Sequence, residues 1–182
     1  PDSVRDALES NRIVYFPDCP VPLPEQATLD FLRRELPSKL RLKNISYHPE
    51  AGRVSGIEAD SATTLRVTDL LRSHLNDVSS FLRRVTGDLT NDARIGTCSF
   101  RPIEEKGRNL KPHASNELVH VDAGAYGATN GDRILRFFVN VSADRDRVWA
   151  TKGTFDDVLE RCGSKAGLLD ESGRLAVSIS KG

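Results

Sequence analysis

The sequence predicts an α+β protein in which a mainly helical N-terminal half supports a mainly antiparallel β half. Two observations lead to this prediction. Residues 60–86 form the clearest amphipathic segment, and the apolar runs after Gly87 are short, β-branched or aromatic, and separated by polar, glycine-containing links. A chain of 182 residues suits one domain, 1–182, in which 1–87 is helical support and 88–182 carries the strands.

The overall charge is balanced, because Lys and Arg together number 26 and so do Asp and Glu. No basic field favours a nucleic-acid backbone, so we expect no nucleic-acid partner. Three widely spaced cysteines are typical of free thiols in a reducing compartment, and no apolar run reaches the length of a membrane span. We therefore expect a cytoplasmic protein.

The first elements alternate between helix and extended chain. "SVRDALES" (3–10) predicts a short helix with Ser3 as its cap, and "RIVYF" (12–16) predicts a strand that Pro17 ends. "EQATLDFLRREL" (25–36) has leucines near helical spacing. In "KNISYHPEAGRVSGI" (43–57), two extended runs flank a turn at "HPEAG", which is the pattern of a hairpin.

The segment 60–86 predicts one long helix. Its apolar face is expected to contain Leu65, Leu71, Leu75, Val78, Leu82 and Val85. Its polar face carries Arg66, Arg72, Arg83 and Arg84, which belong to a solvated face or to a surface that meets anionic lipid headgroups. Beyond it, we expect a helix around "TFDDVLERC" and strands at 93–100, 117–121, 134–141 and 147–150.

"NELVHVDAGAYGATNGDRILRFFVNVS" (116–142) holds the candidate site. Residues i and i+2 of a strand point to the same face, so His120 and Asp122 project an imidazole and a carboxylate together. Non-haem Fe(II) oxygenases use this pair with a distant second histidine. A chain of this composition contains such a spacing by chance about one time in three, so the motif alone leaves open a coincidental pair in a sheet.

Three further residues are candidates for binding an anionic co-substrate. In the run 134–141, alternation places Arg136 on one face with Ile134, Phe138 and Asn140. An arginine within an apolar face is costly to bury unless it meets an anion, and a carboxylate co-substrate is one candidate. The alternatives are an internal ion pair and an arginine at a solvated edge. Arg101, in "SFRP", has the same interpretations. The other histidines, His48, His74 and His113, are interpreted as structural, solvated or part of a substrate loop.

The segments "CSFRPIEEKGR" and "ELVHVDAGAYGATNGDRILRFFVNVSADRDRVWATKGTF" resemble the 3-deoxy-D-manno-oct-2-ulosonic acid (Kdo) hydroxylase family, as do "LESNRIVYFPDCPVPLPEQ" and "KNISYHPEAGRVSG". The resemblance implies a double-stranded β-helix, or jelly roll, supported by helices. It implies Fe(II) bound by His120 and Asp122, with 2-oxoglutarate and O2 as co-substrates. We expect Arg136, Arg101 and Asn140 to bind the co-substrate. Phe138 stands where related oxygenases often have an aromatic hydroxyl.

The activity that the resemblance implies is hydroxylation of Kdo, to give Ko, on the lipid A precursor of lipopolysaccharide. Such a substrate is anionic and membrane-anchored, so Lys106, Arg108 and Lys111, or the arginines of 60–86, become candidate contacts with it at the inner membrane face. The alternative is that these charges are ordinary solvated side chains.

One ligand is missing from the pattern, because no histidine follows His120. Together with the absence of methionine, this leads us to expect a C-terminally truncated chain whose third ligand lies past Gly182, and an incomplete jelly roll. Such a chain is expected to bind metal weakly at best. The alternatives are a chain that has lost a ligand, a non-catalytic cupin-like module that binds a sugar or carboxylate, and a cupin-type isomerase.

Overall fold

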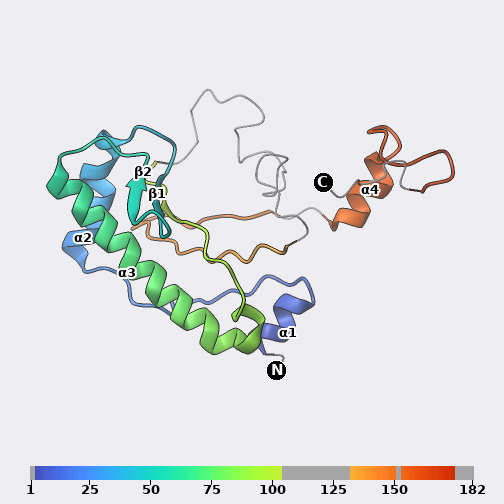
Figure 1. Cartoon of the computed structure of the whole chain (residues 1–182), viewed down its shortest axis with the longest axis horizontal. Helices are drawn as coiled ribbons and strands as arrows, with labels where there is room; N and C mark the ends of the chain where they lie inside the picture. Colours follow the sequence, from blue (N-terminus) through green and yellow to red (C-terminus); the bar gives the residue numbers. More distant parts are fainter. Residues whose placement is uncertain (1–2, 104–131, 151–152, 175–182) are drawn as a thin grey trace. The chain divides into compact units, whose positions relative to one another are not determined.

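The computed structural model describes residues 3–103, 132–150 and 153–174 of the chain (Figure 1). These residues fall into two compact units. The first holds the described residues of Pro1–Arg108 and Ile134–Asp146, and the second holds those of Asn109–Arg133 and Arg147–Gly182. Each unit is described by itself, and the expectation of a single domain stays a prediction.

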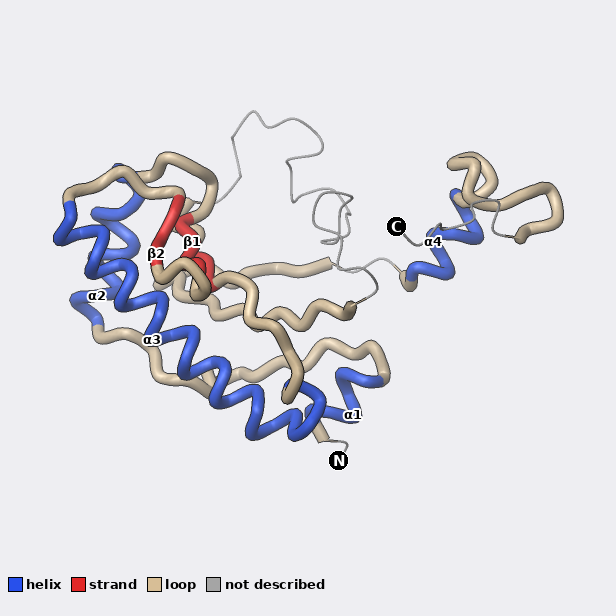
Figure 2. Tube along the Cα trace, in the orientation of Figure 1, coloured by secondary structure: helices blue, strands red, loops and turns tan. Residues whose placement is uncertain are grey.

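A long helix and a small antiparallel sheet form the centre of the first unit. The helix, α3 (Ser61–Thr86), contacts all three strands, β1 (Ile45–His48), β2 (Arg53–Ser55) and β3 (Cys98–Phe100), which lie in the order β2-β1-β3 (Figures 1 and 2). Both strand pairs are antiparallel, with Tyr47 opposite Val54 on one side and opposite Cys98 on the other. The hairpin predicted for 43–57 is confirmed.

The core of this unit lies between α3, the sheet and a helical run that precedes the sheet. That run consists of α2 (Gln26–Asp30), a π-helical turn η1 (Phe31–Glu35) and a 3₁₀ turn η2 (Leu36–Lys39). The buried apolar cluster comprises Phe31, Leu32, Leu36, Ile45, Tyr47, Val67 and Leu71. Burying these side chains removes their apolar surface from water, which is the main force that holds the sheet and the helices together.

Helix α3 begins and ends at the residues that its sequence indicates. The Asp60 carboxylate accepts a hydrogen bond from the Thr63 backbone N–H at 2.8 Å, which satisfies one of the free amides of the first turn. The helix ends at Gly87, whose φ of 59° lies in the region that glycine adopts without strain. The short helix α1 (Val4–Glu9) has a capping box between Ser3 and Asp6, as predicted for 3–10.

The buried face of α3 differs in part from the expected one. Leu71 is buried and Leu75 packs against the core, but Leu65 is 62% exposed and Val67 takes the inward position. The reason is geometric: a helix turns by about 100° per residue, so a residue six positions before Leu71 lies far around the helix, whereas one four positions before it shares its face. Leu65 was therefore assigned to the wrong face.

Several predicted strands do not form ladders within the described part of the chain. Residues 12–16, 134–141 and 147–150 have no strand assignment, and the strand predicted for 93–100 is confined to Cys98–Phe100 (Figure 2). Extended runs become strands only when another strand takes up their backbone hydrogen bonds, and no described segment does so here. The run 117–121 lies outside the described residues. The described fold is α+β with a three-stranded sheet, and the jelly roll stays a prediction.

Gly56 allows the chain to pass close to the sheet where β2 ends. Its carbonyl accepts hydrogen bonds from the backbone amides of Arg41 and Leu42, at 3.0 and 3.3 Å. Its φ is +84°, and a Cβ at this position would overlap the backbone carbonyl oxygen of Asn44. Only glycine meets both requirements without a shift of the chain.

The described part of the second unit contains one helix, α4 (Phe155–Cys162). Its cap, Thr154, forms a capping box with Asp157, and this confirms the helix predicted around 154–162. Among the other described residues of this unit, the Arg147 guanidinium lies 5.4 Å from the centre of the Trp149 ring.

Candidate functional site

The predicted metal ligands, His120 and Asp122, lie outside the described residues, so their role stays a prediction. The same applies to His113 and to Lys106, Arg108 and Lys111. Within the residues that the structure does describe, no group of three His, Cys, Asp or Glu side chains is arranged to hold a metal ion.

Arg101 directly follows β3 and is half-buried. Its Nε donates a hydrogen bond of 2.9 Å to Oδ1 of Asn44, the residue before β1. The register explains the contact. Ile45 pairs with Phe100 in an antiparallel pair, so Asn44 before β1 lies opposite Arg101 after β3 at the end of the sheet. The amide fixes the direction of the guanidinium, whose planar fork suits a carboxylate. Asn44 was not identified from the sequence, since finding it requires the register of β1 and β3.

The run 134–141 contacts α3 through Phe137, and alternate side chains of the run are half-buried. The ring of Phe137 lies 5.7 Å from that of Phe81 on α3, and Val139 and Val141 are also half-buried. Phe81 also contacts Phe16 edge-on at 5.4 Å, so one buried ring receives two extended segments from distant parts of the chain. The alternation predicted for this run is therefore present from Phe137 onward, although its strand ladder is not.

Arg136 and Phe138 occupy the other face of this run. Both side chains are exposed, Phe138 to 58%. Arg136 is not buried in an apolar face, because Phe137 and the valines of the opposite face are the half-buried residues of the run. Its assignment to the co-substrate consequently rests on its position after the HxD segment and on its charge, and no longer on a cost of burial.

Asn140 closes a turn. Its amide Nδ2 donates to the carbonyl of Arg145 at 2.8 Å, and its Oδ1 accepts from the backbone N–H of Ser142 at 3.1 Å. This is the Asx-type bonding by which asparagine stabilises turns. The structure thus gives Asn140 a local structural task, with one remaining amide hydrogen for any other partner.

Two other histidines, His48 and His74, lie within the first unit, one in the hairpin and one on α3. Nε2 of His48 lies 2.8 Å from Oγ of Ser55 across the β1–β2 hairpin. His74 is half-buried on α3, and burial lowers the pKa of its imidazole, an effect that the neighbouring Asp77 partly opposes. Both observations agree with the structural interpretation of these two residues.

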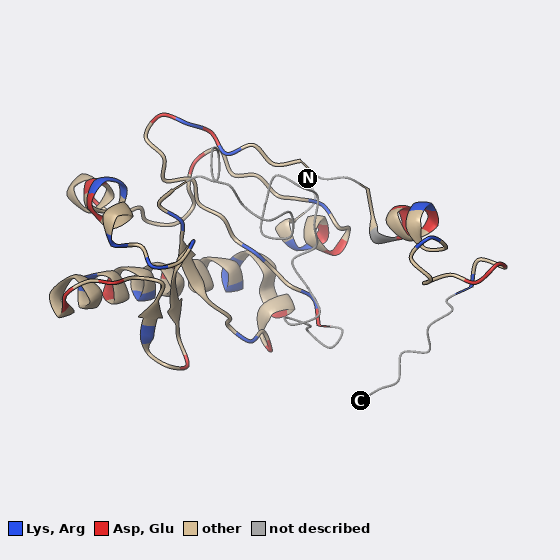
Figure 3. Ribbon diagram, turned by 90° about the horizontal axis from the view of Figure 1, so that it is seen from above, with Lys and Arg blue, Asp and Glu red and all other residues tan. Residues whose placement is uncertain are grey.

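The arginines of α3 have intramolecular contacts. The Arg66 guanidinium stacks 3.9 Å from the centre of the buried Phe31 ring, and Arg72 forms an ion pair of 2.7 Å with Asp69. Arg84 lies 5.6 Å from the Phe81 ring. Acidic residues alternate with these cations along the helix (Figure 3). These contacts favour a solvated, internally paired helix face over a dedicated lipid-binding surface.

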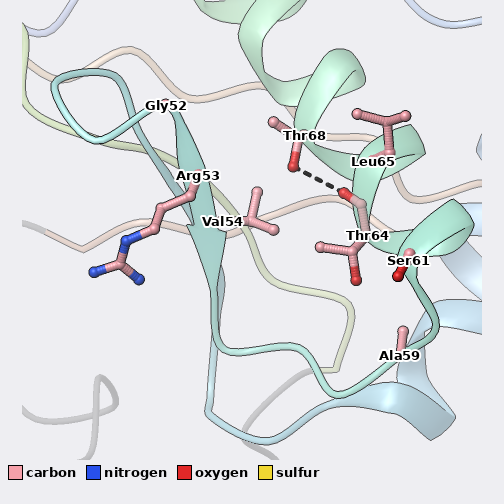
Figure 4. Close-up of a pocket in the computed structure, with 8 residues that line it drawn as sticks. All are labelled: Gly52, Arg53, Val54, Ala59, Ser61, Thr64, Leu65 and Thr68. Carbon is pink, nitrogen blue, oxygen red and sulfur yellow. Dashed lines mark hydrogen bonds between the residues drawn. The ribbon is translucent and has the colours of Figure 1, made fainter.

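A groove of about 360 Å³ lies between β2 and the first turns of α3 (Figure 4). Val54 and Leu65 give it apolar surface, and Arg53, Ser61 and Thr64 contribute polar groups. The Thr68 hydroxyl does not offer its hydrogen to this groove, because it donates to the Thr64 carbonyl at 2.8 Å. No sequence pattern predicted this groove, because it depends on how the hairpin packs against the helix.

The three thiols are free, and Cys98 alone is substantially enclosed. Burial raises the pKa of the Cys98 thiol to about 11, which keeps it protonated and unreactive near neutral pH. Among the described helices, none combines the length and the apolar composition that crossing a bilayer requires.

Comparison with known proteins identifies the family. Neither the curated proteins nor the solved structures gave a match to the chain. A family model described as 3-deoxy-D-manno-oct-2-ulosonic acid (Kdo) hydroxylase matches residues 1–175, which is nearly the whole sequence. The chain therefore belongs to the Kdo hydroxylase family, and this membership implies an enzyme that hydroxylates Kdo.

Proposed function

We propose that the protein is an Fe(II)- and 2-oxoglutarate-dependent dioxygenase that hydroxylates Kdo, to give Ko, on the lipid A inner core of lipopolysaccharide. The observation that carries the proposal is the family match across 1–175, which includes the His120-Val121-Asp122 motif. The reaction class and the lipid-linked substrate are our inference from that motif and from the family's named sugar.

The donor types of the motif suit the proposed metal. A neutral imidazole and a carboxylate, two residues apart, are two of the three ligands of the facial-triad sites that bind non-haem Fe(II). When bound, the metal and its co-substrate would supply the oxidation. In this proposal, His120 and Asp122 hold the metal and orient it, and neither transfers a proton to the sugar.

Arg101 and Arg136 are proposed to recognise carboxylates of the co-substrate or of the acidic sugar. Arg101 has a directed guanidinium, because Oδ1 of Asn44 accepts a hydrogen bond from its Nε. Arg136 lies on the face of 134–141 that points away from Phe81. Asn140 is proposed to contribute mainly by shaping the turn that follows Arg136.

The proposed substrate is anchored in a membrane, so we place the enzyme in the cytoplasm at the inner membrane face. Lys106, Arg108 and Lys111 are the preferred contacts with the anionic glycolipid. The arginines of α3 are less suited, since three of them already contact Phe31, Asp69 and Phe81.

The experiment uses the full-length protein with Fe(II), labelled 2-oxoglutarate and a Kdo-containing lipid A. Succinate is expected to form, to increase when the glycolipid is added, and to accompany one added oxygen on Kdo by mass spectrometry. His120→Ala and Asp122→Ala are expected to abolish both products, whereas His48→Ala, in the β1–β2 hairpin, is expected to retain them.

The outcomes separate the proposal from its rivals. No succinate and no bound iron in the parent protein would refute the dioxygenase proposal. Sugar binding without turnover would support a non-catalytic binding module instead. Full activity in either the His120 or the Asp122 variant would remove that residue from the metal site.

A further inference from the structure

The run 134–141 is held at two places, and each contact comes from a different helix. In its middle, Phe137 packs against Phe81 of α3, with the ring centres 5.7 Å apart. At its end, Nε of Arg33 donates a hydrogen bond of 2.7 Å to the carbonyl oxygen of Val141. Arg136 lies directly before the first contact. The two contacts together set where its backbone runs along the helices.

Arg33 belongs to the π turn η1, whose geometry is unusual. In this turn the Leu36 backbone N–H bonds to the Phe31 carbonyl, which is the i to i+5 pattern of a π turn. In a regular α-helix, residues five apart do not share a face. The wider turn brings both Phe31 and Leu36 into the core, where they are 3% and 0% exposed. Single π turns of this kind occur frequently at functional sites.

The π turn is itself fixed on both sides. The Phe31 ring is buried in the core and carries the Arg66 guanidinium of α3 at 3.9 Å from its centre. Arg33, two residues later, is half-buried rather than extended into solvent. Its guanidinium is a charged donor to a backbone carbonyl, and such bonds are stronger than neutral ones. A surface arginine without a fixed base would lose more side-chain entropy in making the same bond.

We propose that Arg33 is a positioning residue of the enzyme: by holding the Val141 carbonyl, it keeps the run 134–141 in place and thereby keeps Arg136 aligned for an anionic ligand. The inference rests on the proposed function for its consequence in turnover. The anchoring of the run rests on geometry alone. Arg33 touches neither substrate nor metal in this role and acts through the backbone that carries Arg136.

The chain provides a matched control next to Arg33. Arg34 has the same side chain in the same turn, but it is exposed and its described ion pair is a long one of 3.9 Å to Asp30. Arg33→Gln removes the charged donor to Val141, and Arg34→Gln removes an equal charge without touching the run. Arg33→Lys keeps the charge but not the planar Nε–H, so it tests geometry against charge.

The first measurement is the rate of trypsin cleavage after Arg136 in the full-length protein. Cleavage requires the run to leave its two contacts, so its rate reports local release. Arg33→Gln is expected to accelerate it about tenfold, given the strength of a charged hydrogen bond. Arg34→Gln is expected to leave it unchanged. Equal rates in the parent and both variants would overturn the anchoring role.

The second measurement separates positioning from mere support of the fold. In Arg33→Gln, the KM for 2-oxoglutarate is expected to rise about tenfold while kcat changes by less than about threefold, because misplacement of a binding group weakens ground-state recognition first. Arg33→Lys is expected to fall between parent and Arg33→Gln, and it replaces that variant if the glutamine protein fails to fold. If the parent turns over and the KM of Arg33→Gln equals that of the parent, the inference is refuted and the proposed function stays intact. A parent without turnover would refute both the proposed function and this role in it, while the trypsin result would still decide the anchoring.

Discussion

Replacing Gly56 with alanine tests whether the close approach at the end of β2 is a true constraint. Alanine at the observed φ of +84° costs about 1–2 kcal/mol, because its Cβ is poorly tolerated in that region. The new Cβ also overlaps the Asn44 carbonyl, and moving backbone out of the way adds about 1–3 kcal/mol, as overpacking does. The displaced residue is the one that orients Arg101, so the change affects the candidate site as well.

Gly52 provides the control, since its φ is +60° but nothing lies within 4 Å of a built Cβ. Both substitutions reduce the entropy of the unfolded chain equally, so this effect cancels in the difference between them. We expect the Gly56→Ala protein to be less stable than the Gly52→Ala protein by about 1–3 kcal/mol. Its melting temperature should then be lower by roughly 2–4 °C for each kcal/mol. Urea and thermal unfolding, followed by the helical signal in circular dichroism, measure this. Equal stability of the two variants would refute the argument from crowding.

Three further outcomes are expected. Burial lowers the pKa of His74 in the folded chain below its ordinary value of 6.5, so the contribution of His74 to stability is complete above the unfolded pKa and is lost as pH falls. His74→Gln is therefore expected to flatten the decline in urea stability below pH 6.5, and an unchanged slope would contradict this reasoning. Cys98, whose pKa is raised to about 11, is expected to react with iodoacetamide at pH 8 far more slowly than the exposed Cys19 and Cys162. Peptide mass spectrometry measures the labelling, and equal labelling of the three thiols would show that Cys98 is not enclosed. Phe81→Ala is expected to cost about 3–5 kcal/mol in denaturant unfolding, whereas a loss below about 1 kcal/mol would mean that the two rings it contacts hold no packed position.

Sequence patterns predicted the elements whose causes are local. The long helix 61–86 follows from its apolar spacing, its Asp60 cap and Gly87, and the hairpin follows from two extended runs around "HPEAG". Ser3, as a predicted cap, likewise indicated α1, and the local pattern of 154–162 indicated α4. These signals act over a few residues and need no partner from elsewhere in the chain.

Features that depend on a distant partner were not predictable. The π turn at Phe31–Glu35 forms because Phe31 and Leu36 both gain burial, which no local propensity encodes. The runs 12–16 and 134–141 have strand-like alternation, yet a strand also requires a neighbour to accept its hydrogen bonds.

The candidate site shows the same division. Arg101 and Arg136 were identified from charge and pattern, but their surroundings were not. Asn44 as the partner of Arg101, and Arg33 as the anchor of Val141, join residues far apart in the sequence, and a single sequence contains no signal of such pairs. The HxD motif itself was recognised through its spacing, and its geometry stays a prediction.

The double contact of Phe81 has a consequence for how the chain is made. Phe16 precedes α3 and Phe137 follows it at long range, so during synthesis on the ribosome the helix emerges with only one of its two ring partners available. Until Phe137 has been translated, one side of Phe81 stays exposed to water and to other nascent chains. Contacts of such long sequence separation require a large loop to close, so the Phe81–Phe137 contact is expected to form late in folding.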